Sequence, residues 1–97
     1  MTIANTILAQ LGGNKFIVMT GSKNFIASKE SLTMTLTKNK VKAKYLRIVL
    51  DANDTYTMTF FSLKRNLDVL IKSEKTGIYF DQLQSIFTEV TGLDTHL

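Results

Sequence analysis

Residues 32–37 have the sequence Leu-Thr-Met-Thr-Leu-Thr, in which three apolar side chains alternate with three hydroxyls. Successive side chains of a β-strand point to opposite faces, so this period of two predicts a strand with one apolar and one solvated face. The same alternation occurs at residues 55–60, Thr-Tyr-Thr-Met-Thr-Phe. The two stretches therefore predict an antiparallel sheet that covers a core on one side and is rich in threonine and lysine on the other.

Shorter β-branched or alternating runs predict the remaining strands. They lie at residues 16–20, 24–27, 41–50 and 67–75, and a turn-rich Asp-Ala-Asn-Asp at 51–54 joins residues 46–50 to residues 55–60 in a hairpin. The alternation changes near Tyr45, which predicts a β-bulge or a strand break there. Thr76 and Gly77 are expected to turn the chain out of the last strand.

Both ends of the chain have the periodicity of short amphipathic helices. Residues 3–11 place apolar side chains at helical spacing and stop at a pair of glycines. Residues 83–90 repeat this spacing. Asp81 is the expected N-cap, with Gln84 at the capping-box distance, and Gly92 is the expected C-cap.

Together these elements predict a two-layer α+β sandwich that spans residues 1–97 as a single domain. We expect an antiparallel meander sheet of five to six strands, because strands that follow one another in sequence tend to be neighbours. The N- and C-terminal helices are expected on one face of that sheet. A chain of 97 residues with 44% apolar side chains is typical of one globular domain.

Several chemistries lack the residues that they need. The chain has no cysteine, which excludes disulfides, thiolate metal sites and cysteine nucleophiles. Its one histidine, His96, lies next to the C-terminal residue, where an imidazole lacks a rigid setting. Asp51 and Asp54 flank a turn and are expected to bind its backbone. The glycine–lysine segments near residues 12–15 and 21–23 lack phosphate-loop spacing. We therefore expect no enzyme, no catalytic residue, no cofactor and no metal.

Positive charge is concentrated in the first half of the chain. The net charge is +4, but residues 15–47 carry eight basic side chains and one acidic one, whereas the rest carries four basic and seven acidic ones. In a strand over residues 41–45, alternate lysines would project together and neutralise phosphates, and Tyr45 or Phe25 would stack on a base. The candidate nucleic-acid-binding residues for DNA or RNA are Lys38, Lys40, Lys42, Lys44, Tyr45 and Arg47.

Other partners stay open. Lysines also protect exposed edge strands from aggregation, and in that case the threonine-rich face or a strand edge would dock a host protein. A free edge strand would also allow the chain to form a homo-oligomer. No apolar run approaches the roughly 20 residues of a membrane span, and no signal peptide is evident. We therefore expect a cytoplasmic protein that does not bind membranes.

Three segments between residues 7 and 93 have a distinctive sequence. They are Ile-Leu-Ala-Gln-Leu-Gly-Gly-Asn-Lys-Phe at 7–16 with Met19-Thr20-Gly21 and Asn24-Phe25, the hairpin 46–60 with Asp54-Thr55-Tyr56-Thr57, and residues 81–93 with Asp81-Gln82-Leu83, Ile86-Phe87 and Thr91-Gly92-Leu93. The chain thereby resembles a group of small proteins of bacteriophages and other mobile elements that has no assigned activity. The resemblance implies a phage or plasmid origin, a bacterial host cytoplasm and a non-catalytic binding module, and it implies no functional residue.

Overall fold

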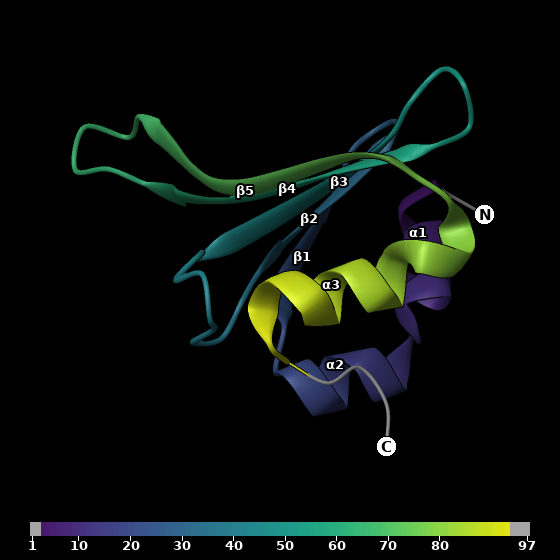
Figure 1. Cartoon of the computed structure of the whole chain (residues 1–97), viewed down its shortest axis with the longest axis horizontal. Helices are drawn as coiled ribbons and strands as arrows, with labels where there is room; N and C mark the ends of the chain where they lie inside the picture. The colour runs from purple at the N-terminus through teal and green to yellow at the C-terminus, as the bar shows by residue number, and fades with distance from the viewer. Residues whose placement is uncertain (1–2, 94–97) are drawn as a thin grey trace.

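A five-stranded antiparallel sheet forms the centre of the computed structural model, which describes residues 3–93 (Figure 1). Its strands are β1 (Lys23–Ala27), β2 (Ser31–Thr35), β3 (Tyr45–Leu50), β4 (Tyr56–Leu63) and β5 (Val69–Ile78). The strands are hydrogen-bonded in the order β1-β2-β3-β4-β5, so each pairs with the next strand in the chain. The expected antiparallel meander is confirmed.

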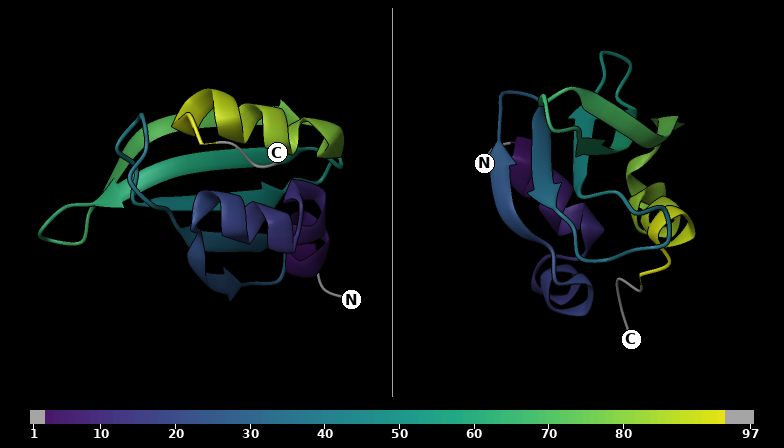
Figure 2. Two further views of the ribbon diagram at one scale, coloured as in Figure 1. Left: turned by 90° about the horizontal axis from the view of Figure 1, so that it is seen from below. Right: turned by 90° about the vertical axis from the view of Figure 1, so that its left-hand side faces the viewer.

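The helices come before and after the sheet in the chain. They are α1 (Ile3–Leu11), α2 (Asn14–Thr20) and α3 (Leu83–Thr91), with a short 3₁₀ helix η1 (Phe80–Gln82) immediately before α3. The α+β class and the two terminal helices are therefore confirmed. Figure 2 shows α1, α2 and α3 beside the strands from two further directions.

The core contains the buried residues of one face of the sheet, which we call the core face. The buried strand residues on this face are Leu32 and Met34 of β2, Leu46 and Ile48 of β3, and Met58 and Phe60 of β4. Residues of all three helices join the same buried cluster. Phe87 of α3 contacts Phe16 of α2 edge-on, with ring centroids 4.9 Å apart, and lies 6.4 Å from the ring of Phe60. The expected placement of both terminal helices on one face of the sheet stays a prediction.

Residues 16–20 are helical, so the strand predicted there is wrong. Their β-branched and aromatic composition favours a strand locally, but Phe16 and Thr20 lie four residues apart and both are buried. The Thr20 hydroxyl donates to the Phe16 carbonyl at 2.7 Å, while Val18 on the opposite side of the helix is 79% exposed. Tertiary packing around Phe16 therefore overrides the local preference. The glycine pair consequently joins two helices and does not lead into a strand.

Residues 36–44 form a loop, so the strand predicted over residues 41–45 is also wrong. The Asn39 amide nitrogen donates to the carbonyls of Thr37 and Ala43, and the Asn39 side-chain oxygen accepts from the Ala43 N–H. A side chain that binds nearby backbone groups in this way competes with a strand ladder. Strand β3 begins at Tyr45, which matches the predicted break in the alternation.

Strand β5 differs from the prediction at both ends. It begins at Val69, and it continues through Thr76 and Gly77 to Ile78 instead of turning there. The pairing with β4 shifts between Tyr56 and Met58, beside Gly77, whose φ is +66°. Gly77 therefore belongs to a β-bulge within the strand, where a positive φ suits glycine.

Polar contacts connect the two terminal helices. Gln84 does not form the predicted capping box with Asp81; its amide nitrogen donates to the Leu11 carbonyl at the end of α1, at 2.8 Å. The box is formed instead by Gln82, whose side-chain oxygen accepts from the Tyr79 N–H.

At the other end of α3 the predicted C-cap is confirmed, because Gly92 has φ +75° and its N–H donates to the Thr88 carbonyl.

Hydrogen bonds of Asp51 hold the acidic turn at residues 51–54, but its carboxylate binds a side chain and not the turn backbone that was expected. The Thr57 hydroxyl donates to an Asp51 carboxylate oxygen at 2.7 Å, and the Asp54 N–H donates to the Asp51 carbonyl. Within residues 3–93, no three acidic or histidine side chains gather in a group that could hold a metal ion. None of the helices in that range is long and apolar enough to cross a membrane. His96 lies outside the described residues.

Gly21, which ends α2, provides a test of this packing. Its φ is +67°, and an added Cβ would lie 2.7 Å from the Thr37 methyl group of the 36–44 loop. Gly77→Ala meets a similar φ with no atom within 4 Å of its Cβ. The left-handed backbone costs each alanine about 1–2 kcal/mol, so we expect Gly21→Ala to lower the free energy of unfolding by more than Gly77→Ala does. Urea titration of both variants measures this, and equal losses would contradict the Gly21–Thr37 contact.

Candidate nucleic-acid interface

The face of the sheet opposite the core face carries the candidate site, and we call it the outer face. Strand register places its residues in rows across the sheet. One row contains Ile26, Thr33, Arg47, Thr59 and Glu74. The adjacent row contains Thr35, Tyr45, Phe61 and Ile71. The outer face is thus largely polar, with two aromatic rings side by side in one row.

Those two rings form the centre of a cluster of four side chains. Tyr45 and Phe61 are stacked, with centroids 5.4 Å apart and planes inclined by 29°. The Lys44 ammonium lies 5.8 Å from the Tyr45 centroid, and the Arg47 guanidinium carbon lies 5.5 Å from the Phe61 centroid. Such cation–π contacts hold positive charge above aromatic rings. We call Lys44, Tyr45, Phe61 and Arg47 the stacked cluster.

Exposure differs within the stacked cluster. Phe61 is only 6% exposed, Tyr45 is partly exposed, and Lys44 and Arg47 are exposed. Phe61 is therefore the buried member of the cluster, while Tyr45 and both cations reach solvent. Within residues 3–93, no acidic side chain forms an ion pair with Lys44 or Arg47. Both charges remain available to an anionic ligand.

Three of the six predicted residues, Lys44, Tyr45 and Arg47, come together in this cluster. The other three, Lys38, Lys40 and Lys42, lie in the 36–44 loop, so the prediction that alternate lysines share one strand face is wrong. The loop leads directly into Tyr45 and is fixed beside β4, because the Lys44 N–H donates to the Phe61 carbonyl at 3.1 Å. Lys38 and Lys42 are exposed in that loop.

Lys40 has a structural contact of its own. Its backbone N–H donates to the Thr91 carbonyl at 2.9 Å, and its ammonium lies 3.4 Å from the Glu89 carbonyl oxygen. Both carbonyls belong to the last turn of α3, where unpaired C=O groups and the helix dipole favour a cation. Lys40 therefore caps α3 and binds the loop to the helix.

Sequence reasoning missed Phe61 and named Phe25 as an alternative to Tyr45. Phe25 of β1 is partly buried and packs against the core, so it does not join the stacked cluster on the outer face. Phe61 follows Phe60, which the alternation of residues 55–60 already assigned to the core. The same period of two places Phe61 on the outer face. Two adjacent aromatic residues at the end of an alternating strand were thus the available signal.

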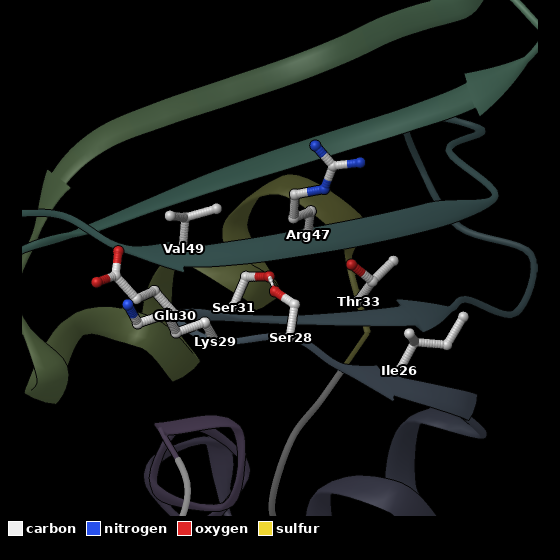
Figure 3. Close-up of a pocket in the computed structure, with 8 residues that line it drawn as sticks. All are labelled: Ile26, Ser28, Lys29, Glu30, Ser31, Thr33, Arg47 and Val49. Carbon is white, nitrogen blue, oxygen red and sulfur yellow. Dashed lines mark hydrogen bonds between the residues drawn. The ribbon is translucent and has the colours of Figure 1, made fainter.

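An open concavity of about 580 Å³ adjoins the stacked cluster at Arg47 (Figure 3). Its lining comes from the outer positions of β1, β2 and β3 and from the turn that joins β1 to β2. The lining residues are Ile26, Ser28, Lys29, Glu30, Ser31, Thr33, Arg47 and Val49. The concavity combines two cations, three hydroxyls and one carboxylate, and sequence reasoning singled out only Arg47 among them.

Comparisons with known proteins found no counterpart: no family model, no curated protein and no solved structure matches this chain.

The contacts of Lys40 separate its role from that of its neighbours. We expect Lys40→Ala to lower the free energy of unfolding by about 0.3–1 kcal/mol, the usual range for a cation at a helix C-terminus. Lys38→Ala, in the same loop but without such a contact to α3, is the matched control and should leave stability unchanged. Thermal unfolding followed by circular dichroism measures both. Equal melting temperatures for the two variants would refute the capping role.

Proposed function

We propose that this protein is a non-catalytic module that binds single-stranded nucleic acid through the outer face of its sheet. The stacked cluster carries the proposal. The partly exposed Tyr45 ring offers a surface on which an unpaired base can stack, and its contact with the Phe61 ring holds it in place. Stacking on aromatic side chains is the usual source of affinity for single strands, because every base has a π-face.

Charge around Tyr45 supports the same function. Lys44 lies over the Tyr45 ring and Arg47 over the Phe61 ring, and the exposed Lys38 and Lys42 lie in the loop that leads into β3. Cations beside a stacked base can neutralise the phosphates that flank it. Lys40 is left out of this group because it caps α3.

Unpaired strands fit this surface better than a duplex does. A base in a duplex is already stacked on its neighbours, and removing it costs a few kcal/mol. A sheet that presents aromatic side chains to splayed bases is a recurrent way of binding single strands. The six residues of β3, at about 3.4 Å each, give the outer face a track of about 20 Å for such a strand.

The proposal extends to the setting of the protein. The resemblance of three segments to small proteins of bacteriophages and mobile elements supports a phage or plasmid origin and a bacterial host cytoplasm. In such a host cell, single-stranded nucleic acid is the ligand class that the stacked cluster favours. This part of the proposal depends on the resemblance and not on the geometry of the outer face.

Binding of a fluorescent single-stranded oligonucleotide, followed by anisotropy, tests the role of Tyr45. We expect Tyr45→Ala to weaken binding about 5- to 150-fold, which corresponds to about 1–3 kcal/mol for one stacked base. Tyr45→Phe keeps the ring and should retain most of the affinity. Absence of binding to both single-stranded DNA and single-stranded RNA at about 50 mM salt would refute the proposal.

Salt dependence tests the role of Arg47 in the same assay. Each phosphate contact contributes about 0.7 to the slope of log K against log salt for a single strand. Arg47→Ala should therefore lower both the affinity and the slope. Lys15→Ala removes an equal charge from the exposed surface of α2 and serves as the matched control, with little change in the slope expected. Equal slopes for Arg47→Ala and the wild type would place the phosphate contact elsewhere.

A second candidate function, the docking of a host protein, is favoured by the hairpin between β4 and β5. Figure 1 shows this hairpin extending away from the helices. Its exposed apolar side chains are Leu63, Leu67, Val69, Leu70 and Ile71. Leu67, near the end of the hairpin, is 74% exposed and has φ +68°, a backbone region that bulky residues rarely adopt. Several exposed apolar side chains on one hairpin are a feature of interaction sites.

The edge of β5 is less suited to self-association than its length suggests. Its ten residues form one outer edge of the sheet, but its pairing with β4 is irregular at two places. Bulges in an edge strand oppose the addition of a further strand. The side chains of the hairpin are therefore the more favourable docking surface, and a homo-oligomer through β5 is the less favoured alternative.

Replacing two hairpin residues separates the two candidate functions. We expect Leu67→Ser combined with Leu70→Ser to leave oligonucleotide affinity unchanged, because neither side chain lies in the two outer-face rows that hold the stacked cluster. If a host protein docks on the hairpin, the same variant should weaken its binding about 10-fold or more, since each buried aliphatic side chain contributes about 1.5–3 kcal/mol. Affinity capture from a bacterial lysate compares the variant with the wild type, and sedimentation velocity shows whether the chain self-associates. Identical capture by the two proteins would rule out the hairpin as the docking surface.

A further inference from the structure

We infer that the concavity beside Arg47 binds the terminal phosphate of a nucleic-acid strand, so that the protein recognises a phosphorylated strand end. This inference rests on the proposed function, because the strand must first lie on the outer face. It adds a ligand class and a second group of residues. Those residues are Lys29, Ser28, Ser31, Thr33 and Arg47, which line the concavity on three neighbouring segments.

Strand register sets the geometry of the concavity. Ile26 is paired with Thr33, and Thr33 is paired with Arg47, so the three residues lie side by side on β1, β2 and β3. Ser31 is likewise paired with Val49. Figure 3 shows Arg47, Thr33 and Ile26 on the same side of their strands. The Ser28 and Ser31 hydroxyls, at the end of the β1–β2 turn, are hydrogen-bonded to each other.

The chemistry of this lining suits a phosphate monoester. The oxygens of a phosphate monoester accept hydrogen bonds from hydroxyls and, more strongly, from charged donors such as a guanidinium group. Arg47 supplies a planar fork of donors on one side, Lys29 supplies an ammonium group from the turn, and Thr33 supplies a hydroxyl between the strands. Ile26 and Val49 add apolar contacts for the sugar or the terminal base.

The position of the concavity favours a strand end over an internal phosphate. Tyr45, Arg47 and Val49 are successive outer residues of β3, so the concavity follows the stacked cluster along the same strand. The β1–β2 turn at residues 28–30 lies beyond them and forms the far wall. A terminal monoester also carries about −1.5 to −2 charge and three free oxygens, more than an internal diester. The two cations, the Thr33 hydroxyl and the second O–H of the Ser28–Ser31 pair match this larger demand.

Glu30 is the one carboxylate in the lining, and it opposes an anion. Its side chain lies beside Lys29 at the edge of the concavity, across from Arg47 (Figure 3). Like charges repel at this range, so Glu30 limits the affinity of the site. Glu30→Gln should therefore strengthen the binding of a phosphorylated strand, whereas Lys29→Gln should weaken it. These opposite effects at adjacent residues distinguish a phosphate site from a general loss of structure.

Three forms of one oligonucleotide test the inference: one with a 5′-phosphate, one with a 3′-phosphate and one with hydroxyls at both ends. We expect one phosphorylated form to bind about 5- to 10-fold more tightly than the hydroxyl-ended form, as for a hydrogen-bonded charge that stays partly solvated. Lys29→Gln and Ser28→Ala should each reduce that preference without changing the affinity for the hydroxyl-ended form. Glu30→Gln should increase the preference, and Lys64→Gln, which removes a cation from the β4–β5 hairpin, should leave it unchanged.

The outcomes separate this inference from the proposed function. Equal affinity for all three forms overturns the terminal-phosphate site and leaves the single-strand proposal intact. A preference that persists in both Lys29→Gln and Ser28→Ala also overturns it, because the phosphate then binds elsewhere. Failure of every form to bind overturns both proposals. Lys29 and Ser28 are exposed, so thermal unfolding should show wild-type stability for both variants.

Discussion

Burial of one face of the sheet is the constraint on which the outer face depends. Phe60 lies in the core against Phe87, so the next residue of the same strand must project to the other side. That residue is Phe61, and a large ring on a polar face lowers its exposure by packing against its cross-strand neighbour Tyr45. The stacked cluster is thus a consequence of core packing as well as a surface feature.

Cations complete the outer face because the two rings are stacked there. Arg47 lies next to Tyr45 in the alternation of β3 and covers Phe61, and Lys44 approaches the other ring. A guanidinium group on an aromatic face keeps most of its hydrogen-bonding capacity. Arg47 can therefore contribute to the packing of Phe61 while presenting donors to the adjoining concavity. The proposed contacts with a base and with a phosphate meet at this one side chain.

The basic side chains in the middle of the chain have two different roles: some stabilise the fold, and others stay exposed on the surface. Lys40 binds the last turn of α3 and thereby connects the 36–44 loop to the helix. The Thr37 hydroxyl donates to the Thr20 carbonyl at the end of α2, and Gly21 approaches Thr37 closely. The loop that precedes Tyr45 is therefore held by two helices as well as by β4. This attachment fixes the position from which Lys42 and Lys44 extend.

The sequence by itself determined the elements whose periodicity was strong: the alternating strands β2 and β4, the hairpin that joins β3 to β4, and helices α1 and α3 with the Gly92 cap. It also placed Tyr45, Arg47 and Lys44 in one candidate site, since they are close in the chain. Only the tertiary structure decided that residues 16–20 are helical, because the burial of Phe16 and Thr20 outweighs β propensity. It likewise decided that residues 36–44 form a loop, because Asn39 binds their backbone. It alone brought Phe61 and the β1–β2 turn beside Arg47. These residues are distant in sequence, and strand register, which depends on long-range packing, makes them neighbours.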